Sequence, residues 1–146
     1  WKEGVPYRES CGQVVQSLGF ILAAARRPDG KVFFHCTSGE DRTGMLAGLY
    51  RMLTQGWDAR GAFEREMCVR GYEAGNRGKP SPVVALVREN LTPVFLRLAW
   101  LIETRAMTPA TLEAAICAKD PADSLAFRNS LLADASAFRC SRPAKN

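Results

Sequence analysis

One stretch decides how this chain is expected to fold: KVFFHCTSGEDRTG, residues 31–44. Its first part, Val32 to His35, follows a Pro-Asp-Gly turn and is rich in β-branched and aromatic residues, which predicts a short buried strand. Its last part opens a segment in which apolar residues recur at helical spacing until Gly56. A cysteine therefore stands where a strand is expected to end, and an arginine where a helix is expected to begin.

The loop between Cys36 and Arg42 suits a phosphate-sized anion. A tight loop that opens a helix directs its free backbone N–H groups to one spot, and the helix dipole adds positive potential there. Arg42 can complete this cradle with two hydrogen bonds to phosphoryl oxygens. The same potential stabilises the thiolate of Cys36, which is then a nucleophile at neutral pH. The expected chemistry is attack of Cys36 on phosphorus, with the loop stabilising the charge on the equatorial oxygens.

The motif HCTSGEDRT, residues 35–43, resembles the HC-x5-R-[ST] loop of the cysteine-based protein tyrosine phosphatase superfamily. The continuation to Trp57 is similar to bacterial dual-specificity-like members. The resemblance implies an α/β fold whose central sheet is flanked by a mainly helical C-terminal half. We expect residues 1–146 to form one domain, with the family-like part at about 1–102 and a helical extension at about 103–146.

The resemblance also implies roles for the loop residues. Cys36 is the expected nucleophile, with a buried, inert cysteine as the alternative. His35 is expected to fix the loop by hydrogen bonds without entering the chemistry, and the Thr43 hydroxyl to help the thiolate leave when the phosphocysteine is hydrolysed. The expected phosphate-binding set is Thr37, Ser38, Gly39, Glu40, Asp41 and Arg42.

A general acid has to protonate the leaving oxygen as the P–O bond breaks. Glu3 is the first choice, because Trp1-Lys2-Glu3-Gly4 lies where these phosphatases carry a Trp-Pro-Asp loop, although the Pro and Asp are absent here. Asp41 is the second choice, because Asp-Arg-Thr also occurs in lipid-active relatives in which an aspartate at this place is assigned the acid role. The alternatives are a solvated Glu3 and a structural Asp41 that orients Arg42 or caps the following helix.

The rest of the chain is predicted to be mainly helical. Ser10 and Gln13 form a capping box that predicts a first helix ending at Ala25. Asp58 is placed to cap a short helix, and Pro93 is expected to kink or break a long core helix that begins near residue 81.

Two further features bear on the site and on the fold. Residues 71–82 form the clearest long loop, in which Tyr72, Arg77 and Lys79 are candidates to contact a substrate or to be ordinary solvated residues. Since only one strand is evident, the other strands either precede Trp1 in a longer product, which we prefer, or are replaced by helices.

Composition narrows the class of protein. The 146 residues carry a net charge of +5, which suits anionic substrates, and the basic residues are too scattered to indicate a nucleic-acid partner. The chain shows neither an apolar run long enough to span a membrane nor a signal peptide. Five cysteines without a C-x-x-C pair favour free thiols and a cytoplasmic location. A Cys117–Cys140 disulfide in an exported protein is the alternative.

The expected function is phosphomonoester hydrolysis through a phosphocysteine, without a metal or other cofactor. The expected substrate is phosphotyrosine, another phosphoprotein or a small phosphomonoester. Glu40 stands where lipid- and inositol-phosphate-active relatives often place a lysine, and its charge would repel a highly anionic head group. The alternatives are a phosphoinositide or inositol phosphate phosphatase, and a catalytically inactive phosphate-binding pseudophosphatase.

Overall fold

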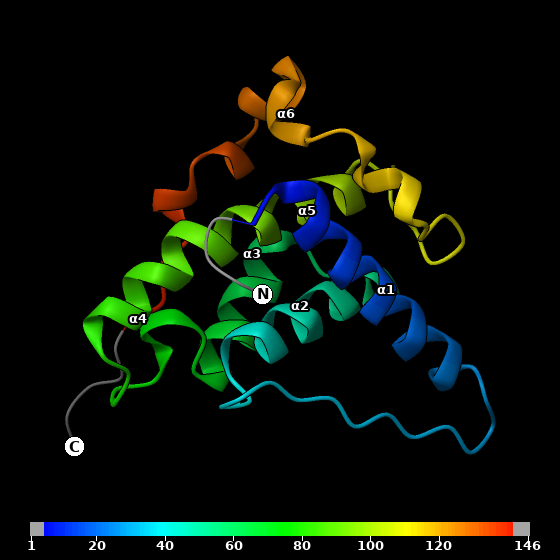
Figure 1. Ribbon diagram of the computed structural model, residues 1–146, viewed down its shortest axis with the longest axis horizontal. Helices are drawn as coiled ribbons and strands as arrows, with labels where there is room; N and C mark the ends of the chain where they lie inside the picture. The colour runs from blue at the N-terminus through cyan, green and yellow to red at the C-terminus, as the bar shows by residue number, and fades with distance from the viewer. Residues whose placement is uncertain (1–4, 142–146) are drawn as a thin grey trace.

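Helices provide the regular structure of the computed structural model, which describes residues 5–141 (Figure 1). The α-helices are α1 (Tyr7–Ala25), α2 (Asp41–Gln55), α3 (Ala59–Gly61), α4 (Ser81–Leu86), α5 (Thr92–Glu103) and α6 (Leu125–Arg128). Two π-helical segments, η1 (Ala62–Met67) and η4 (Val87–Leu91), continue α3 and α4. The 3-10 turns are η2 (Cys68–Arg70), η3 (Glu73–Gly75), η5 (Ala114–Ala118), η6 (Pro121–Asp123), η7 (Leu131–Ala133) and η8 (Ala135–Ala137).

The predicted α/β fold with a central sheet is wrong, because residues 5–141 contain no β-strand. The segment that was expected to form the buried strand runs alone along one edge of the molecule, between the end of α1 and the start of α2 (Figure 1). Phe33 is 88% exposed instead of buried. A strand needs a neighbour to pair with its backbone groups. The described part of the chain brings no second extended segment alongside, so residues 31–36 remain coil.

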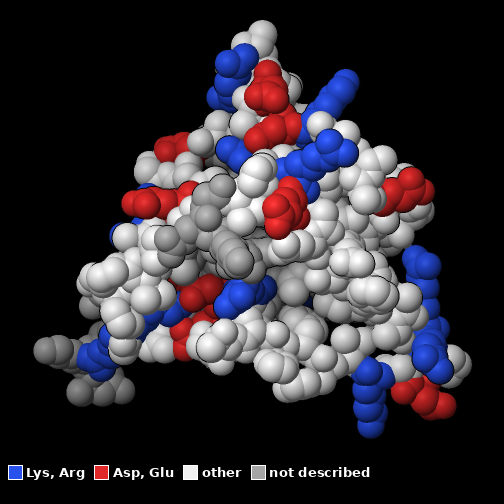
Figure 2. Space-filling model, viewed as in Figure 1, with Lys and Arg blue, Asp and Glu red and all other residues white. Residues whose placement is uncertain are grey.

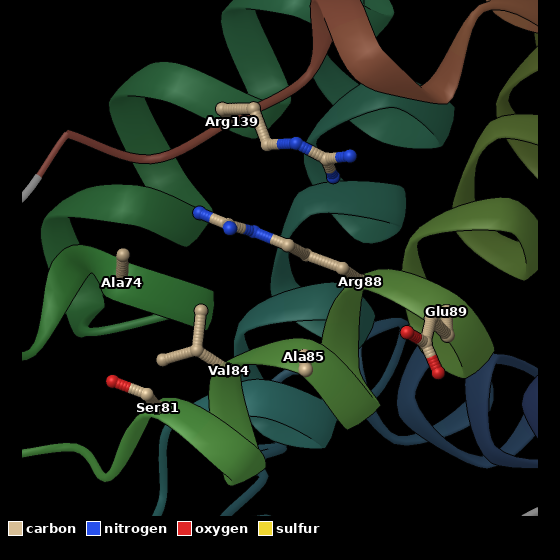
Figure 3. Close-up of a pocket in the computed structure, with 7 residues that line it drawn as sticks. All are labelled: Ala74, Ser81, Val84, Ala85, Arg88, Glu89 and Arg139. Atoms are coloured by element: carbon tan, nitrogen blue, oxygen red, sulfur yellow. The ribbon is translucent and has the colours of Figure 1, made fainter.

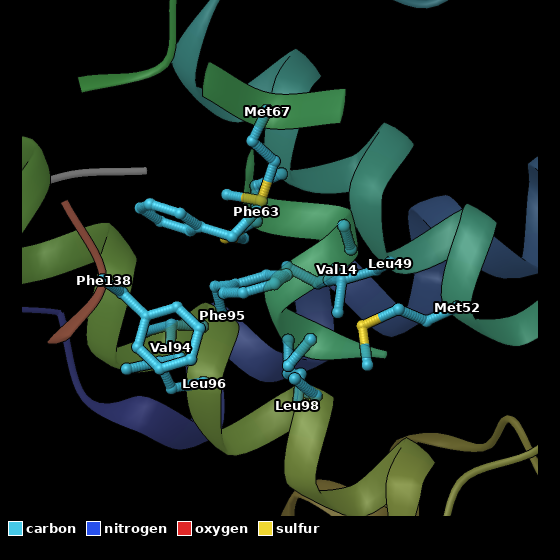
Figure 4. Close-up of a cluster of buried hydrophobic side chains, with 14 of the residues drawn as sticks. Val14, Leu49, Met52, Phe63, Met67, Val94, Phe95, Leu96, Leu98 and Phe138 are labelled. Atoms are coloured by element: carbon cyan, nitrogen blue, oxygen red, sulfur yellow. The ribbon is translucent and has the colours of Figure 1, made fainter. Parts of the chain in front are cut away.

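Helix packing builds the core that the sheet was expected to provide. Helix α2 packs against η1 and α5, and α1 lies across both α2 and α5. Figure 4 shows Phe63, Phe95 and Phe138 gathered among leucine, valine and methionine side chains. The Phe63 ring centroid lies 6.0 Å from that of Phe95 and 5.4 Å from that of Phe138. Because α2 belongs to this core, the loop that opens α2 stands on a rigid base.

The helix boundaries test the local predictions. Helix α1 ends at Ala25 as predicted, but the capping box is wrong: the helix already begins at Tyr7, after Pro6, and Ser10 is buried inside it. A proline just before the first turn suits a helix start, because its missing N–H is not needed there.

The two other boundary predictions are confirmed. Asp58 caps α3, since its Oδ1 accepts a hydrogen bond from the backbone N–H of Gly61 at 2.6 Å. The helix that begins at Ser81 is interrupted near Pro93, where the π-helical η4 precedes α5. Proline lacks the N–H that a continuous α-helix would use, so a local change of winding at this point is expected.

Disulfides tie the C-terminal part of the chain to the helical core. Cys11 in α1 is bonded to Cys117 in η5, and Cys68 in η2 is bonded to Cys140. The expectation of mostly free thiols is therefore wrong, and so is the alternative pairing of Cys117 with Cys140. Among the described residues, Cys36 is the free cysteine.

Surface charge is dispersed on the face shown in Figure 2. Lysine and arginine side chains lie singly or in small groups between acidic ones on that face. In the described range, no helix combines the length and the apolar character needed to cross a bilayer.

Candidate active site

The loop after Cys36 turns sharply into α2. Residues 37–40 form consecutive bends, and α2 begins at Asp41 with Glu40 as its N-cap. Gly39 has a φ of +74°, a left-handed conformation that glycine adopts without a steric penalty. The loop therefore reverses direction within a few residues and brings Cys36 to the N-terminal end of the helix.

Cys36 is surrounded by hydrogen-bond donors. Burial raises the pKa of its thiol, but hydrogen bonds from the Thr43 hydroxyl, the Thr43 N–H and the loop N–H groups of Gly39 and Ser38 outweigh burial and lower the pKa to about 6. The Thr43 hydroxyl is buried and has no hydrogen-bond partner of normal geometry in the described chain, so its hydrogen is free to turn toward the sulfur. At neutral pH Cys36 is thus mainly a thiolate.

His35 directly precedes Cys36, and Arg42 stands at the other end of the loop. The Arg42 guanidinium donates a hydrogen bond through Nη2 to Thr37 Oγ1 at 3.3 Å, which folds its side chain back toward the start of the loop. His35 is exposed, and its Nδ1 lies 3.0 Å from the Cys36 carbonyl oxygen, to which the Nδ1–H tautomer donates. Arg42 therefore adds a fixed positive charge to the N–H groups of the loop.

A second loop, residues 71–79, contacts the carboxylates of Glu40 and Asp41. We call residues 71–79 the facing loop. Lys79 Nζ lies 2.6 Å from Asp41 Oδ1 and 3.0 Å from Glu40 Oε2. The backbone N–H of Glu73 donates to Asp41 Oδ1 at 2.8 Å, and Asn76 Nδ2 donates to Glu40 Oε1 at 2.6 Å. Glu40 and Asp41 thus turn their carboxylates toward the facing loop.

Residues 6–77 match the tyrosine phosphatase family. This similarity to the family extends over about half of the chain. The matched segment contains α1, the loop from Cys36 to Arg42, α2 and most of the facing loop. The site described above therefore lies in the part of the chain that carries the resemblance.

Two curated relatives are similar over a shorter segment. Both are named dual specificity protein phosphatase TpbA, from Pseudomonas aeruginosa strains UCBPP-PA14 and PAO1. Each is 49% identical to the chain over 52 residues, which is 36% of this chain and 23% of the relative. The chain thus matches about a quarter of the length of these relatives. No solved structure is significantly similar to the chain.

The structure places the other predicted site residues as follows. Glu3 lies outside the described residues. The Asp41 carboxylate does not cap α2, because its contacts go to the facing loop. Tyr72 is fully buried and its hydroxyl lies 3.1 Å from Thr92 Oγ1, so it is not a substrate contact, whereas Arg77 is exposed.

No sequence pattern indicates that the facing loop carries the partners of Glu40 and Asp41. Lys79 was expected at the surface but has a side chain only 5% exposed. Its position in a glycine- and proline-rich segment predicts a loop. It does not predict the contact with Asp41, which lies 38 residues earlier in the sequence. Within residues 5–141, no three His, Cys, Asp or Glu side chains are arranged to hold a metal ion.

Proposed function

We propose that this chain forms the phosphate-binding and nucleophilic part of a metal-independent phosphomonoester hydrolase that works through a phosphocysteine. The single observation that carries the proposal is the environment of Cys36, whose thiolate is stabilised by Thr43, Gly39 and Ser38. A nucleophilic thiolate and a guanidinium at the two ends of one short loop are what attack on a bound phosphate requires.

The first step forms a bond between Cys36 Sγ and phosphorus while the bond from phosphorus to the leaving oxygen breaks. The electron pair of that bond goes to the leaving oxygen, which takes a proton from the general acid. Arg42 and the loop N–H groups compensate the charge on the three equatorial oxygens. In the second step water attacks phosphorus and gives a proton to the carboxylate that the general acid became in the first step. The S–P bond breaks with its electron pair on sulfur, and the Thr43 hydroxyl stabilises the departing thiolate.

Glu3 and Asp41 are the two candidates for the general acid. Asp41 remains a candidate, and its contacts with Lys79 and Glu73 also support a structural role. Glu3 stays the first choice on the resemblance alone. Replacement of Glu3 by Gln and of Asp41 by Asn separates them: removal of the acid lowers turnover of substrates with a poor leaving group far more than turnover of para-nitrophenyl phosphate.

The proposed substrates are phosphotyrosine and other phosphoproteins, and dual specificity is the property named for the relatives. The sequence-based case against a phosphoinositide substrate is weaker than expected, because the Glu40 charge is paired with Lys79 at 3.0 Å. Comparison of kcat/KM for a phosphotyrosine peptide, a phosphoserine peptide and an inositol phosphate distinguishes these classes.

Turnover of para-nitrophenyl phosphate in the presence of EDTA tests the proposal. We expect metal-independent release of para-nitrophenol by the wild-type protein and none by the Cys36→Ser variant. A folded wild-type protein that binds orthovanadate but shows no turnover would support the phosphate-binding pseudophosphatase instead.

We also propose that the protein works in an oxidising compartment. Disulfides persist where the surroundings are oxidising and are rare in the cytosol. The Cys11–Cys117 and Cys68–Cys140 bonds both close over long stretches of chain. Thiol alkylation of the native protein after rapid acid trapping, with fractionation of the cell, tests this location.

A further inference from the structure

Lys79 is a buried cation that the reaction steps above do not use. Its side chain is 5% exposed, and its Nζ contacts the Gly71 carbonyl oxygen at 2.8 Å in addition to the two carboxylates. Removing an ammonium group from water is costly unless its partners compensate the charge. The position of Lys79 therefore indicates a function that depends on those partners.

The partners of Lys79 are the two residues that directly precede Arg42. Glu40 and Asp41 place two negative charges in the loop whose N–H groups are to bind a phosphate, and their side chains are only 19% and 15% exposed. Like charges on adjacent residues that both contact the same Lys79 Nζ repel each other, and water screens this repulsion less in a partly buried site. Lys79 compensates one of these charges and draws both carboxylates to the facing loop.

The facing loop lies close to residues 36–42, which we call the phosphate loop. Gly71 has a φ of +91°, and a Cβ at this position would lie 3.1 Å from the Glu40 carboxyl carbon. A side chain at residue 71 would therefore displace Glu40. The contact of Lys79 with the Gly71 carbonyl fixes this close approach.

Glu73 supports the same arrangement from the other side. It has a φ of +53°, which is unfavourable for a residue with a Cβ and persists only where the surroundings impose it. Its buried carboxylate is held by Arg88 and by the backbone N–H of Cys140, while its own N–H donates to Asp41. Figure 3 shows the Arg88 side chain extending across a pocket of about 370 Å³, beside Arg139.

We propose that Lys79 is a positioning residue of the phosphate loop: it neutralises and holds Glu40 and Asp41, so that Arg42 and the loop N–H groups present net positive potential to a phosphomonoester dianion. The effect of Lys79 on turnover rests on the proposed function. The ligand class it favours is a tetrahedral oxyanion.

The charged groups around Cys36 define what a change at Lys79 does. Its own loop carries His35, Glu40, Asp41 and Arg42, and the facing loop adds Lys79. Helix α2 adds Arg51, and η1 and η2 add Glu66 and Arg70. Glu66 forms an ion pair with both arginines. Removal of Lys79 therefore leaves an uncompensated negative charge within the loop that joins Cys36 to Arg42.

The test compares Lys79→Met with Lys79→Arg, which keeps the charge, and with Lys119→Met, which makes the same change at an exposed lysine. Three quantities are measured: the pH dependence of Cys36 alkylation by iodoacetamide, the Kd for orthovanadate, and kcat and KM for para-nitrophenyl phosphate. For Lys79→Met we expect the alkylation midpoint to rise by about one pH unit and the vanadate Kd by about tenfold. Lys79→Arg should recover most of both effects, and Lys119→Met should show neither.

A charge-compensating variant separates this role from a purely structural one. Glu40→Gln combined with Lys79→Met removes one of the uncompensated carboxylate charges, so vanadate binding should recover relative to Lys79→Met alone. If Lys79→Met does not fold, the double variant is compared with Glu40→Gln, and we expect at least about threefold weaker vanadate binding because Asp41 remains unpaired.

The proposal is overturned if Lys79→Met behaves like Lys119→Met, or if the double variant binds vanadate no better than Lys79→Met. Where Lys79→Met does not fold, it is overturned if the double variant binds vanadate as tightly as Glu40→Gln. Alkylation and vanadate binding need no turnover. A wild-type protein that is inactive on every phosphomonoester would therefore refute the proposed function. Alkylation and vanadate binding would still decide whether Lys79 supports anion binding.

Discussion

At the scale of single residues, the sulfur of Cys36 and the hydroxyl of Thr43 are the closest link between sequence and chemistry. A hydrogen bond from this hydroxyl to the sulfur is one cause of the lowered pKa of Cys36, because a donated hydrogen bond favours the ionised form. Because the pKa of Cys36 is lowered to about 6, the thiolate predominates above that pH and is lost as the pH falls through it.

The pH dependence of alkylation provides the first prediction. The rate of Cys36 modification by iodoacetamide should rise with pH along a single titration with a midpoint near 6. Thr43→Ala removes one of the donors and should raise the midpoint by about one pH unit. Thr54→Ala is the matched control, because its hydroxyl bonds only within α2, to Tyr50 O. A wild-type midpoint close to the ordinary thiol value of 9.0 would refute this view of the loop.

The second residue prediction concerns Arg42. Lysine keeps the charge but cannot make two parallel hydrogen bonds to phosphoryl oxygens. Arg42→Lys should therefore lower kcat/KM for para-nitrophenyl phosphate by about 100-fold or more. Alkylation of Cys36 checks that the loop of the variant remains intact. Near-wild-type turnover by Arg42→Lys would exclude the bidentate role.

At the scale of elements, α3 depends on its N-terminal cap. Asp58 accepts the Gly61 N–H at 2.6 Å, and this N–H has no partner within the helix. Asp58→Ala should lower the free energy of unfolding by about 1 kcal/mol, measured by urea titration. The cap lies away from the loop, so Asp58→Ala should leave the alkylation midpoint of Cys36 unchanged. Asp58→Asn retains an acceptor oxygen and should lose less stability.

The elements also explain which predictions succeeded. The end of α1, the cap at Asp58 and the interruption near Pro93 depend on residues close in sequence, so local patterns predict them. The strand at Val32–His35 depended on neighbours that the described chain does not provide, and Val32, Phe33 and His35 are exposed instead. Lys79 escaped prediction for the same reason, since its partner Asp41 is 38 residues away.

At the scale of the whole molecule, two disulfides connect the C-terminal part to the helical core. They join residues 106 and 72 positions apart in sequence. The number of cysteines shows that pairing is possible but not which cysteines pair, because connectivity depends on the fold. The fold brings α1 beside η5 and η2 beside the segment around Cys140.

Loss of either disulfide should destabilise the whole fold. Replacement of Cys11 and Cys117 by serine should lower the free energy of unfolding by roughly 2–5 kcal/mol, because the unfolded chain regains the freedom that the cross-link removed. Denaturant unfolding monitored by circular dichroism measures the change. A stability unchanged from that of the wild type would show that this disulfide does not contribute to the fold.

The most direct test of the central claim is to trap the phosphorylated intermediate. The protein is mixed with excess para-nitrophenyl phosphate, quenched within milliseconds and digested, and the peptide containing Cys36 is examined by mass spectrometry. The account predicts one phosphoryl group on the Cys36 sulfur of the wild-type protein and none on that peptide of the Cys36→Ser variant. Turnover without phosphorylation of Cys36, or turnover that persists in Cys36→Ser, would contradict it.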